Sequence, residues 1–347
     1  MSARDRERDG NGAVGRSRLH VVTGKGGTGK TTVAASLALA LASGGGRVLL
    51  VEVEGRQGIA RLFDCPPLPY EERRVAVAPD GGEVFALAVD AEAALLEYLE
   101  MFYGMRRAGH VLTRFGAVDF ATTIAPGMRD VLLTGKATEA VRRRTGSDRR
   151  RGGRGGSQGP FVYDAVVVDA PPTGRIAQFL SVSAEVAGLA RVGPIRNHAD
   201  KVMETMRSHE TSVHFVSVLE EMPAQECLDG IADVRGVGLN VGSVLINMVR
   251  DPLFGPRILS AAAEGDLDID TLARGLKAAM LENPEQKSRQ LAVEITEHAR
   301  RIRVETAIRE RLSGIEYPVR ELPLISDGID LAGLYDLAEL LREQGMT

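Results

Sequence analysis

The sequence predicts an α/β fold, a mostly parallel and doubly wound sheet with an added helical subdomain. Short aliphatic runs typical of buried strands alternate with segments of helical periodicity along the 347 residues. A strand at 19–23, a helical pattern at 32–42 and a strand at 47–53 form the first βαβ unit. Hydrophobic residues make up 44% of the chain, which is ample for a sizeable core.

The rest of the chain continues this alternation. Two stretches are too long for simple crossovers between strands, 91–141 and 253–312, and we expect helical elaborations there. Because ligands of parallel sheets bind at the carboxyl ends of the strands, candidate site residues are sought at those ends. The further buried strands are predicted at 83–89, 161–168, 213–219, 242–246 and 317–322.

Two segments are predicted to lie outside the folded core. Residues 1–18 show no periodicity and are expected to form a flexible tail, and the remainder, 19–347, is predicted to be one domain. Residues 142–159 form a basic, Gly/Arg-rich insertion that we expect to be disordered. Such a run could touch RNA or an anionic membrane, but it lacks aromatic residues and is more often a solvated loop. No specific nucleic-acid partner is therefore expected.

Composition narrows the class of protein further. No apolar run approaches the roughly 20 residues of a membrane helix, and the N-terminus lacks the apolar segment of a signal peptide. We expect a cytoplasmic protein whose membrane association is at most peripheral. Cys65 and Cys227 are the only cysteines and lie far apart, so neither a disulfide framework nor a zinc site is expected within one subunit.

A glycine-rich motif after the first strand predicts nucleotide binding. It satisfies the pattern G-x-x-x-x-G-K-[ST] and stands between a strand and a helix, which argues against a chance glycine turn. Bare glycines let backbone N–H groups turn toward phosphates, Lys30 would reach the β- and γ-phosphates, and Thr31 would offer its hydroxyl to Mg²⁺. We therefore expect ATP and Mg²⁺ as ligands. The predicted nucleotide-binding residues here are Gly24, Lys25, Gly26, Gly27, Thr28, Gly29, Lys30, Thr31 and Thr32.

A second motif follows the strand predicted at 161–168. Asp169 ends this aliphatic strand and is the expected support of the Mg²⁺ site, through a water molecule. The turn after it would sense the γ-phosphate as a switch formed by Pro171, Pro172, Thr173 and Gly174.

Two carboxylates, Glu52 and Glu54, stand at the end of the strand at 47–53. One of them could orient or deprotonate the attacking water, because in the predicted fold this strand end opens on the nucleotide. The alternative is a pair of solvated charges. We assign the role to Glu54, and expect Glu54, Lys25 and Lys30 to be the catalytic residues.

These motifs resemble a family of dimeric ATPases with a deviant phosphate loop that carries an early lysine, here Lys25. The family includes arsenite-pump, tail-anchored-protein-targeting, septum-positioning and plasmid-partition ATPases. The run from Asp169 to Gly174 resembles the D-x-x-P-T-G switch of the arsenite-pump and tail-anchor branch. By this resemblance Asn247 reads adenine, Glu220 lies at the nucleotide and Pro323 begins a loop covering the base.

The resemblance also implies how such a protein works. Lys25 would cross an interface to a partner's phosphates, so hydrolysis would be slow and dimer-dependent, and the partner would be a second copy or a paralogous ATPase. The dimer would bind or hand over a protein or hydrophobic client. An apolar stripe that could carry this client comprises Leu95, Leu96, Leu99, Met101, Phe102, Met105 and Leu112, although such a stripe is more often core or dimer contact.

The chain departs from the family at informative points. Glu54-Gly55-Arg56-Gln57 stands where the family usually has Asp-Pro-Ala-His, so turnover could be slow or altered. The cysteines that bind zinc or arsenite in the family have no counterpart here. Two alternatives remain at this point: a spatial regulator resembling partition ATPases, and an ATP-binding module with little turnover. The former needs a lipid-binding tail, and the amphipathic segment 331–341 is acidic.

Overall fold

The computed structural model describes residues 17–90, 93–94, 97, 128–145, 159–189, 194–326 and 328–347. Within these residues the core is an eight-stranded sheet in the order β3-β4-β2-β5-β1-β6-β7-β8. All neighbouring strands are parallel except β3, which runs antiparallel to β4 at the edge. The strands are β1 Leu19–Gly24, β2 Arg47–Glu52, β3 Arg73–Val77, β4 Glu83–Ala88, β5 Ala165–Asp169, β6 Thr211–Ser217, β7 Val241–Val249 and β8 Val319–Pro323.

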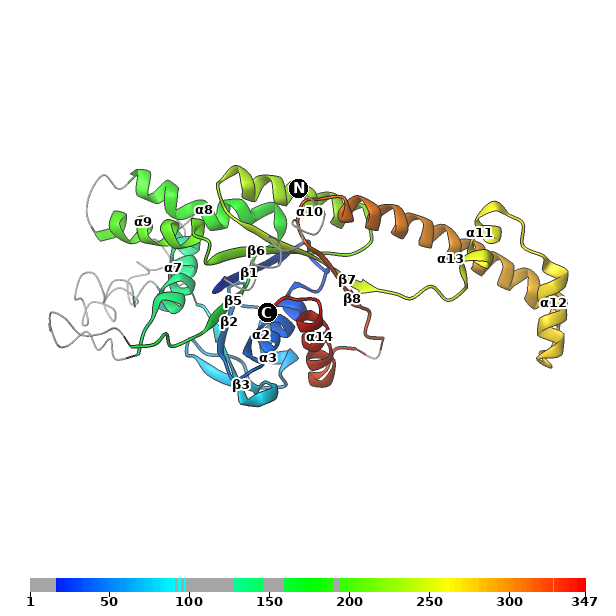
Figure 1. Cartoon of the computed structure of the whole chain (residues 1–347), viewed down its shortest axis with the longest axis horizontal. Helices are drawn as coiled ribbons and strands as arrows, with labels where there is room; N and C mark the ends of the chain where they lie inside the picture. The colour runs from blue at the N-terminus through cyan, green and yellow to red at the C-terminus, as the bar shows by residue number, and fades with distance from the viewer. Residues whose placement is uncertain are drawn as a thin grey trace, which may run out of the picture.

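Helices cover both faces of the sheet, so the predicted fold class is confirmed (Figure 1). The alternating strand positions therefore contribute to two separate cores, as expected for strands buried on both sides. One face packs against α2 Lys30–Ala42, α3 Gly58–Leu62 and α14 Leu331–Glu343. The other packs against α7 Met128–Arg142, α8 Thr173–Leu189, α9 Pro194–Arg207 and α10 Glu221–Gly236.

The structure places strands where the aliphatic runs predict them, with two differences. β5 begins at Ala165 instead of 161, because Phe161 forms an isolated antiparallel bridge with Arg144 before the chain enters the sheet. β3 was not predicted. It is a half-exposed edge strand that includes Arg73 and Arg74, so it lacks the continuous apolar run of a buried parallel strand.

The C-terminal helix α14 is a packing element. Its apolar side chains Leu334, Leu337 and Leu341 are at most 1% exposed and join the core around α2. The amphipathic pattern at 331–341 is therefore used for packing inside the protein. Among the described residues, the structure contains no helix with the length and apolar character needed to cross a bilayer.

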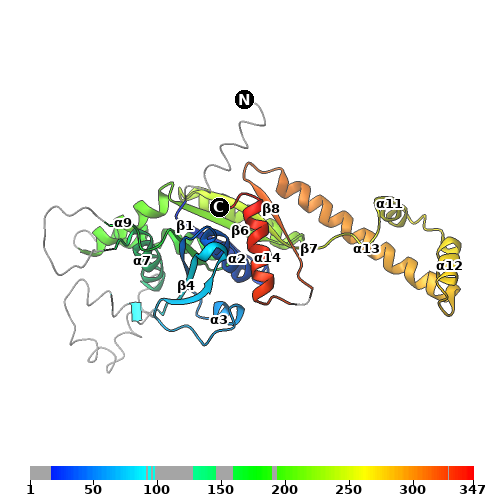
Figure 2. The same cartoon turned by 60° about the horizontal axis from the view of Figure 1, so that its bottom comes forward.

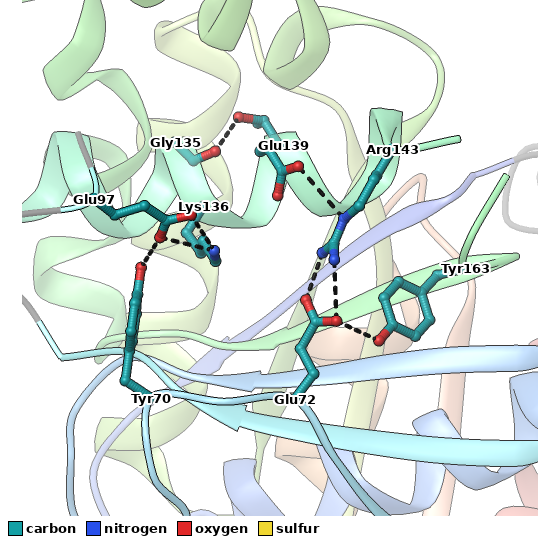
Figure 3. Close-up of polar contacts among 9 residues, drawn as sticks. Tyr70, Glu72, Glu97, Gly135, Lys136, Glu139, Arg143 and Tyr163 are labelled. Atoms are coloured by element: carbon teal, nitrogen blue, oxygen red, sulfur yellow. Dashed lines mark hydrogen bonds and ion pairs between the residues drawn. The ribbon is translucent and has the colours of Figure 1, made fainter. Parts of the chain in front are cut away.

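Helix α7 is tied to the rest of the protein by two groups of polar contacts (Figure 3). Arg143 pairs with Glu72, which also accepts a hydrogen bond from the Tyr163 hydroxyl at 2.7 Å. Burial works against the charge of Glu72, but the bonds from Arg143 and Tyr163 outweigh it and hold the pKa below its ordinary value. Lys136 pairs with Glu97 in the same way, at 2.9 Å.

A helical arm leaves the body of the protein beyond β7 (Figures 1 and 2). It consists of α11 Pro256–Glu264, α12 Ile269–Ala278 and the 30-residue α13 Pro284–Ser313. Only the base of α13 joins the main core, through Ile308 and Leu312. These helices occupy the stretch 253–312.

Residues 1–16 of the predicted tail at 1–18, residues 146–158 of the predicted insertion at 142–159, and the apolar stripe at 95–112 apart from Glu97 lie outside the described residues. The remaining ends of the two segments belong to the fold: Ser17 is buried, Arg142 ends α7 and Arg144 bridges to Phe161. The described ends of the insertion lie at the N-terminal edge of β5, where Thr145 N–H donates to Pro160 O at 2.9 Å. The insertion therefore starts and ends at the edge of the sheet opposite the carboxyl ends of the strands.

Candidate nucleotide-binding site

The glycine motif forms a loop that joins the end of β1 to the start of α2. Gly29 precedes the helix with φ of +82°, a left-handed conformation that favours glycine. A Cβ on Gly24 would lie 2.2 Å from Val216 O of β6, so only glycine fits between the strands. Gly26 and Gly27 are exposed. The backbone of this loop is therefore bare toward solvent, and the N-terminus of α2 points at it, as anion binding requires.

Asn247 of β7 supports this loop from the side. It is 4% exposed, and its side-chain Nδ2 donates to Thr28 O at 2.9 Å. The next residue, Met248, has φ of +58°, and the register between β7 and β8 shifts here. This irregularity is unusual for a non-glycine residue and places the half-exposed Met248 side chain next to Gly29. Sequence reasoning missed Met248, because a positive φ in a strand has no local signal.

Asp169 lies directly beneath the loop. Its Oδ2 accepts a hydrogen bond from the Thr31 hydroxyl at 2.7 Å, and the side chain is 8% exposed. Burial raises the pKa of Asp169 to about 6, with Glu52 and Glu54 adding to the effect while Thr31 and Lys30 oppose it. Within the described part of the chain, Asp169 Oδ1 and Thr173 Oγ1 are buried without a hydrogen-bond partner.

These two unpartnered atoms fit the chemistry expected of the site. A buried polar atom without a partner costs about 1–3 kcal/mol, so it usually serves a ligand or a water. Mg²⁺ prefers oxygen ligands and keeps several of its waters. Asp169 Oδ1 and the Thr31 hydroxyl are such oxygens, and the residues present therefore fit a Mg²⁺ ion at this point.

The two carboxylates after β2 have different environments. Glu52 is 2% exposed, and its oxygens accept the backbone N–H groups of Gln57 at 2.5 Å and Ile59 at 3.2 Å. It thus satisfies the start of α3. Glu54 lies on the loop between β2 and α3, and its side chain is 24% exposed. Arg56 Nε lies 3.7 Å from the Glu54 carboxylate. Of the two, Glu54 has the carboxylate that is available to a ligand.

The early lysine forms an ion pair within its own chain. Lys25 Nζ contacts Glu226 Oε1 of α10, and the two side chains are 32% and 35% exposed. Glu220 lies at the N-cap of α10 and is exposed. Pro323 ends β8 and is exposed as well. These residues come from neighbouring strand ends, but no direct contact joins Glu220 or Pro323 to the glycine loop among the described contacts.

The switch residues connect the loop to the helices. Pro171 O accepts the buried Thr23 hydroxyl at 2.7 Å, and Thr173 begins α8 right after Pro172. In the first turn of α8, Arg175 lies 3.6 Å from Asp130 of α7. Arg129, the neighbouring residue of α7, donates to Val53 O at 3.4 Å. The first turn of α7 therefore contacts both the Glu54 loop and the start of the switch helix, a link that sequence reasoning missed.

A family model describes the part of the chain that builds this site. Residues 17–209, which include the glycine loop, Glu54 and Asp169, match the model of anion-transporting ATPases. The chain belongs to the anion-transporting ATPase family. Membership implies ATP binding and hydrolysis, and it confirms the expected relation to arsenite-pump ATPases.

Mycobacterial relatives match nearly the whole chain. It is 50% identical to the ATPase BagA of Mycobacterium tuberculosis over 329 residues, 95% of this chain and 94% of BagA. A Mycobacterium bovis protein, named provisionally as an ATPase, matches equally well. A Halobacterium salinarum protein, named provisionally as an arsenical pump-driving ATPase, is 27% identical over 253 residues, 70% of this chain and 37% of the relative.

Proposed function

We propose that this ATPase is Mg²⁺-dependent, that it hydrolyses ATP efficiently only when two subunits close on each other, and that closure controls binding or hand-over of a protein or hydrophobic client. The observation that carries the metal and nucleotide assignment is the hydrogen bond from the partly buried Thr31 to the buried Asp169 beneath the glycine loop, with Asp169 Oδ1 left unpartnered among the described residues. ATP binds through the loop amides and Lys30.

The Mg²⁺ site is assembled from two oxygens that already touch. The Thr31 hydroxyl has one proton and two lone pairs, so it can donate to Asp169 and face the cation at the same time. Asp169 Oδ1 would accept a hydrogen bond from a water that such a cation holds. The cation, when bound, neutralises charge on the phosphate oxygens. It also favours the ionised form of Asp169, whose pKa burial has raised.

Glu54 positions the attacking water. Glu52 cannot take this role without breaking its bonds to Gln57 and Ile59, which hold the loop that carries Glu54. A Cβ atom placed on Gly58 would lie 3.1 Å from the Thr31 methyl group. The loop that carries Glu54 therefore packs against the threonine proposed to bind the metal. Arg56 Nε lies 3.7 Å from the Glu54 carboxylate and competes with a water for it, which supports slow turnover. This contact also favours a second candidate, an ATP-binding module with very little hydrolysis.

Subunit closure acts through Lys25. In a single chain Lys25 is paired with Glu226, and both side chains are only partly exposed. Reaching the phosphates of a partner, as the family resemblance implies, requires this pair to open. ATP bound in the partner supplies the competing negative charge. The partner is a second copy of this chain or a paralogous ATPase.

The contacts of α7 support the coupling to a client. Its first turn touches the Glu54 loop through Arg129 and the switch helix through Asp130. A displacement of either segment by the γ-phosphate would therefore move α7, which follows directly on residues 98–127. That stretch contains most of the predicted client stripe.

Two variants separate binding from hydrolysis. Lys30→Ala should abolish ATP binding in calorimetry, because it removes the cation that faces the phosphates. Glu54→Ala should bind ATP normally but lose at least about 100-fold in phosphate release, since general-base catalysis contributes that much. The exposed Glu71→Ala in the following loop is a matched control and should behave as wild type. Full hydrolysis by the Glu54 variant would refute its role.

The Glu54 variant also tests closure and the client. Mass measurement of the purified protein should show pairing with ATP and not with ADP, and purification from cells in the trapped state should recover a paralogue or an apolar polypeptide. Identical masses with both nucleotides would contradict nucleotide-gated pairing.

A further inference from the structure

The arm helix α13 carries two different faces. One face is covered by α11 and α12 and buries Ala292, Ile295 and Ala299. By its 30 residues the helix is about 45 Å long, and most of that length projects beyond the sheet (Figures 1 and 2). The opposite face is exposed along its whole length.

The exposed face has a regular spacing. Its central residues alternate three and four positions apart, the spacing of a helix that pairs with another helix. Val293 and Val304 on this face are 58% and 54% exposed, although the helix is otherwise highly charged outside its covered side. We call this face the α13 seam, and it consists of Gln286, Gln290, Val293, Glu297, Arg300, Val304 and Ala307.

The seam is complementary to itself in one orientation. When two copies of α13 lie antiparallel with their centres between His298 and Ala299, Val293 of one copy faces Val304 of the other. Glu297 then faces Arg300, twice, because the arrangement has two-fold symmetry. A parallel alignment would instead set Glu297 against Glu297 and Arg300 against Arg300, which repels.

The flanking charges agree with the same orientation. On one side of the seam Glu294 would approach Arg301 of the other copy, and on the other side Arg289 would approach Glu310. Within the described part of the chain, Glu294, Glu297, Arg300 and Arg289 form no ion pair of their own, so their charges are available. Arg301 Nε already lies 3.5 Å from Glu305 of its own chain, so we expect Arg301 to contribute less to the contact between the two copies.

We propose that α13 is an interaction surface for a second copy of this chain, which binds antiparallel along the α13 seam. The contact is one helix against one helix and is therefore of modest size and weak, with an affinity that falls with salt. It uses a surface remote from the glycine loop and does not rest on nucleotide-gated pairing. It is therefore tested without nucleotide.

Cysteine cross-linking distinguishes the orientation. In a Cys65→Ser background, with the buried Cys227 kept, the double variant Val293→Cys/Val304→Cys should form a disulfide-linked dimer under mild oxidation. Each single variant should not, because two copies of one position lie about 16 Å apart along the antiparallel pair. A mixture of the two single variants should cross-link only between unlike chains. Equal cross-linking of a single variant, or none in the double variant, would overturn the proposal.

A charge swap tests the pairing of Glu297 with Arg300. In sedimentation at low salt without nucleotide, Glu297→Arg should weaken self-association at least tenfold. The double variant Glu297→Arg/Arg300→Glu should restore it with itself but not with wild type. The exposed Glu343→Arg of α14 carries the same charge change away from the seam and should behave as wild type. Unchanged association of Glu297→Arg, or failure of the swap to restore it, would refute the inference.

Discussion

At the scale of single residues, the candidate site depends on Asp169, a carboxylate that the folded protein has to desolvate. Its raised pKa reflects burial near two other carboxylates, with only the Thr31 hydroxyl and Lys30 to compensate. A buried carboxylate of this kind destabilises the ligand-free protein and stabilises the state in which a ligand is bound.

Replacing Asp169 should therefore separate stability from activity. Asp169→Asn keeps the shape of the side chain and removes the buried charge. We expect phosphate release to fall at least about 100-fold, as for loss of a metal-supporting group, while the melting temperature of the ligand-free protein stays equal or rises. Asp164→Asn, at the other end of β5, is the control and should keep full activity, because the Asp164 carboxylate accepts Arg47 N–H at 2.8 Å at the edge of the sheet remote from the glycine loop. A much lower melting temperature for Asp169→Asn would contradict this account.

Two buried histidines on the neighbouring strands β1 and β6 form a pair at the end of the sheet opposite the candidate site. His20 and His214 are both 0% exposed, and His20 Nδ1 lies 3.1 Å from His214 Nε2. Ser17 O lies beside His20 Nε2 and Ser243 N–H donates to His214 Nδ1, so a single arrangement of neutral tautomers satisfies all four ring nitrogens. Burial lowers the pKa of His20 to about 4 and that of His214 well below its ordinary value, with the charges of His20 and Arg320 adding to the latter shift.

The histidine pair predicts a loss of stability in acid. Between pH 6.5 and 4 the unfolded chain binds protons that the folded pair excludes, so stability is full above pH 6.5 and falls as the pH drops. The slope is about 1.4 kcal/mol per pH unit for each imidazole. Asp169, with its raised pKa, works in the opposite sense between pH 3.8 and 6. Urea unfolding across this range should show the loss in wild type, a steeper loss in Asp169→Asn and a shallower one in His20→Gln. Equal slopes in all three would contradict the assignment.

At the scale of elements, residues 146–158 of the basic insertion are flanked by a stem whose contacts do not involve them. Arg144 and Phe161 form a bridge, Thr145 is bonded to Pro160, and the Phe161 ring lies between the guanidinium groups of Arg18 and Arg144 at 3.4 and 3.7 Å. This stem lies at the edge of the sheet remote from the glycine loop.

Removing the insertion should therefore leave the enzyme intact. Replacing residues 146–158 by a short glycine-serine linker should change the free energy of unfolding by less than about 0.5 kcal/mol, because loop-closure entropy varies slowly with length. ATP hydrolysis should be unchanged. Chemical denaturation and phosphate release measure both. A large loss of activity would show that the insertion reaches the site. A second variant, whose linker also replaces Thr145 and Pro160, should be less stable because it loses the hydrogen bond between them.

At the scale of the whole molecule, two surfaces point to association. The glycine loop and the Lys25–Glu226 pair lie at the carboxyl ends of the strands, whereas the α13 seam lies on an arm that projects from the body. Pairing through the first surface depends on nucleotide and pairing through the second on charge, so the effects of ATP and of salt on mass should be separable.

The sequence by itself determined the buried parallel strands, the glycine loop and Asp169, because each depends on local features. A strand buried on both faces needs a continuous apolar run, and a phosphate loop needs glycine at fixed spacing. The edge strand β3 was not predicted, because a strand exposed on one side does not need a continuous apolar run. The roles of Asp169, Glu54, Lys30 and Asn247 at the site stay predictions.

Only the tertiary structure decided which groups meet. Asn247 reaches the loop at Thr28, Lys25 meets Glu226, and His20 stacks on His214, each across about 200 residues of sequence. It also decided that Glu52 is used by the backbone while Glu54 is left available, and that one side of α13 is uncovered. The physical reason is common to all: partners in a parallel sheet are set by strand order and helix crossover, and a single sequence carries no local signal for either.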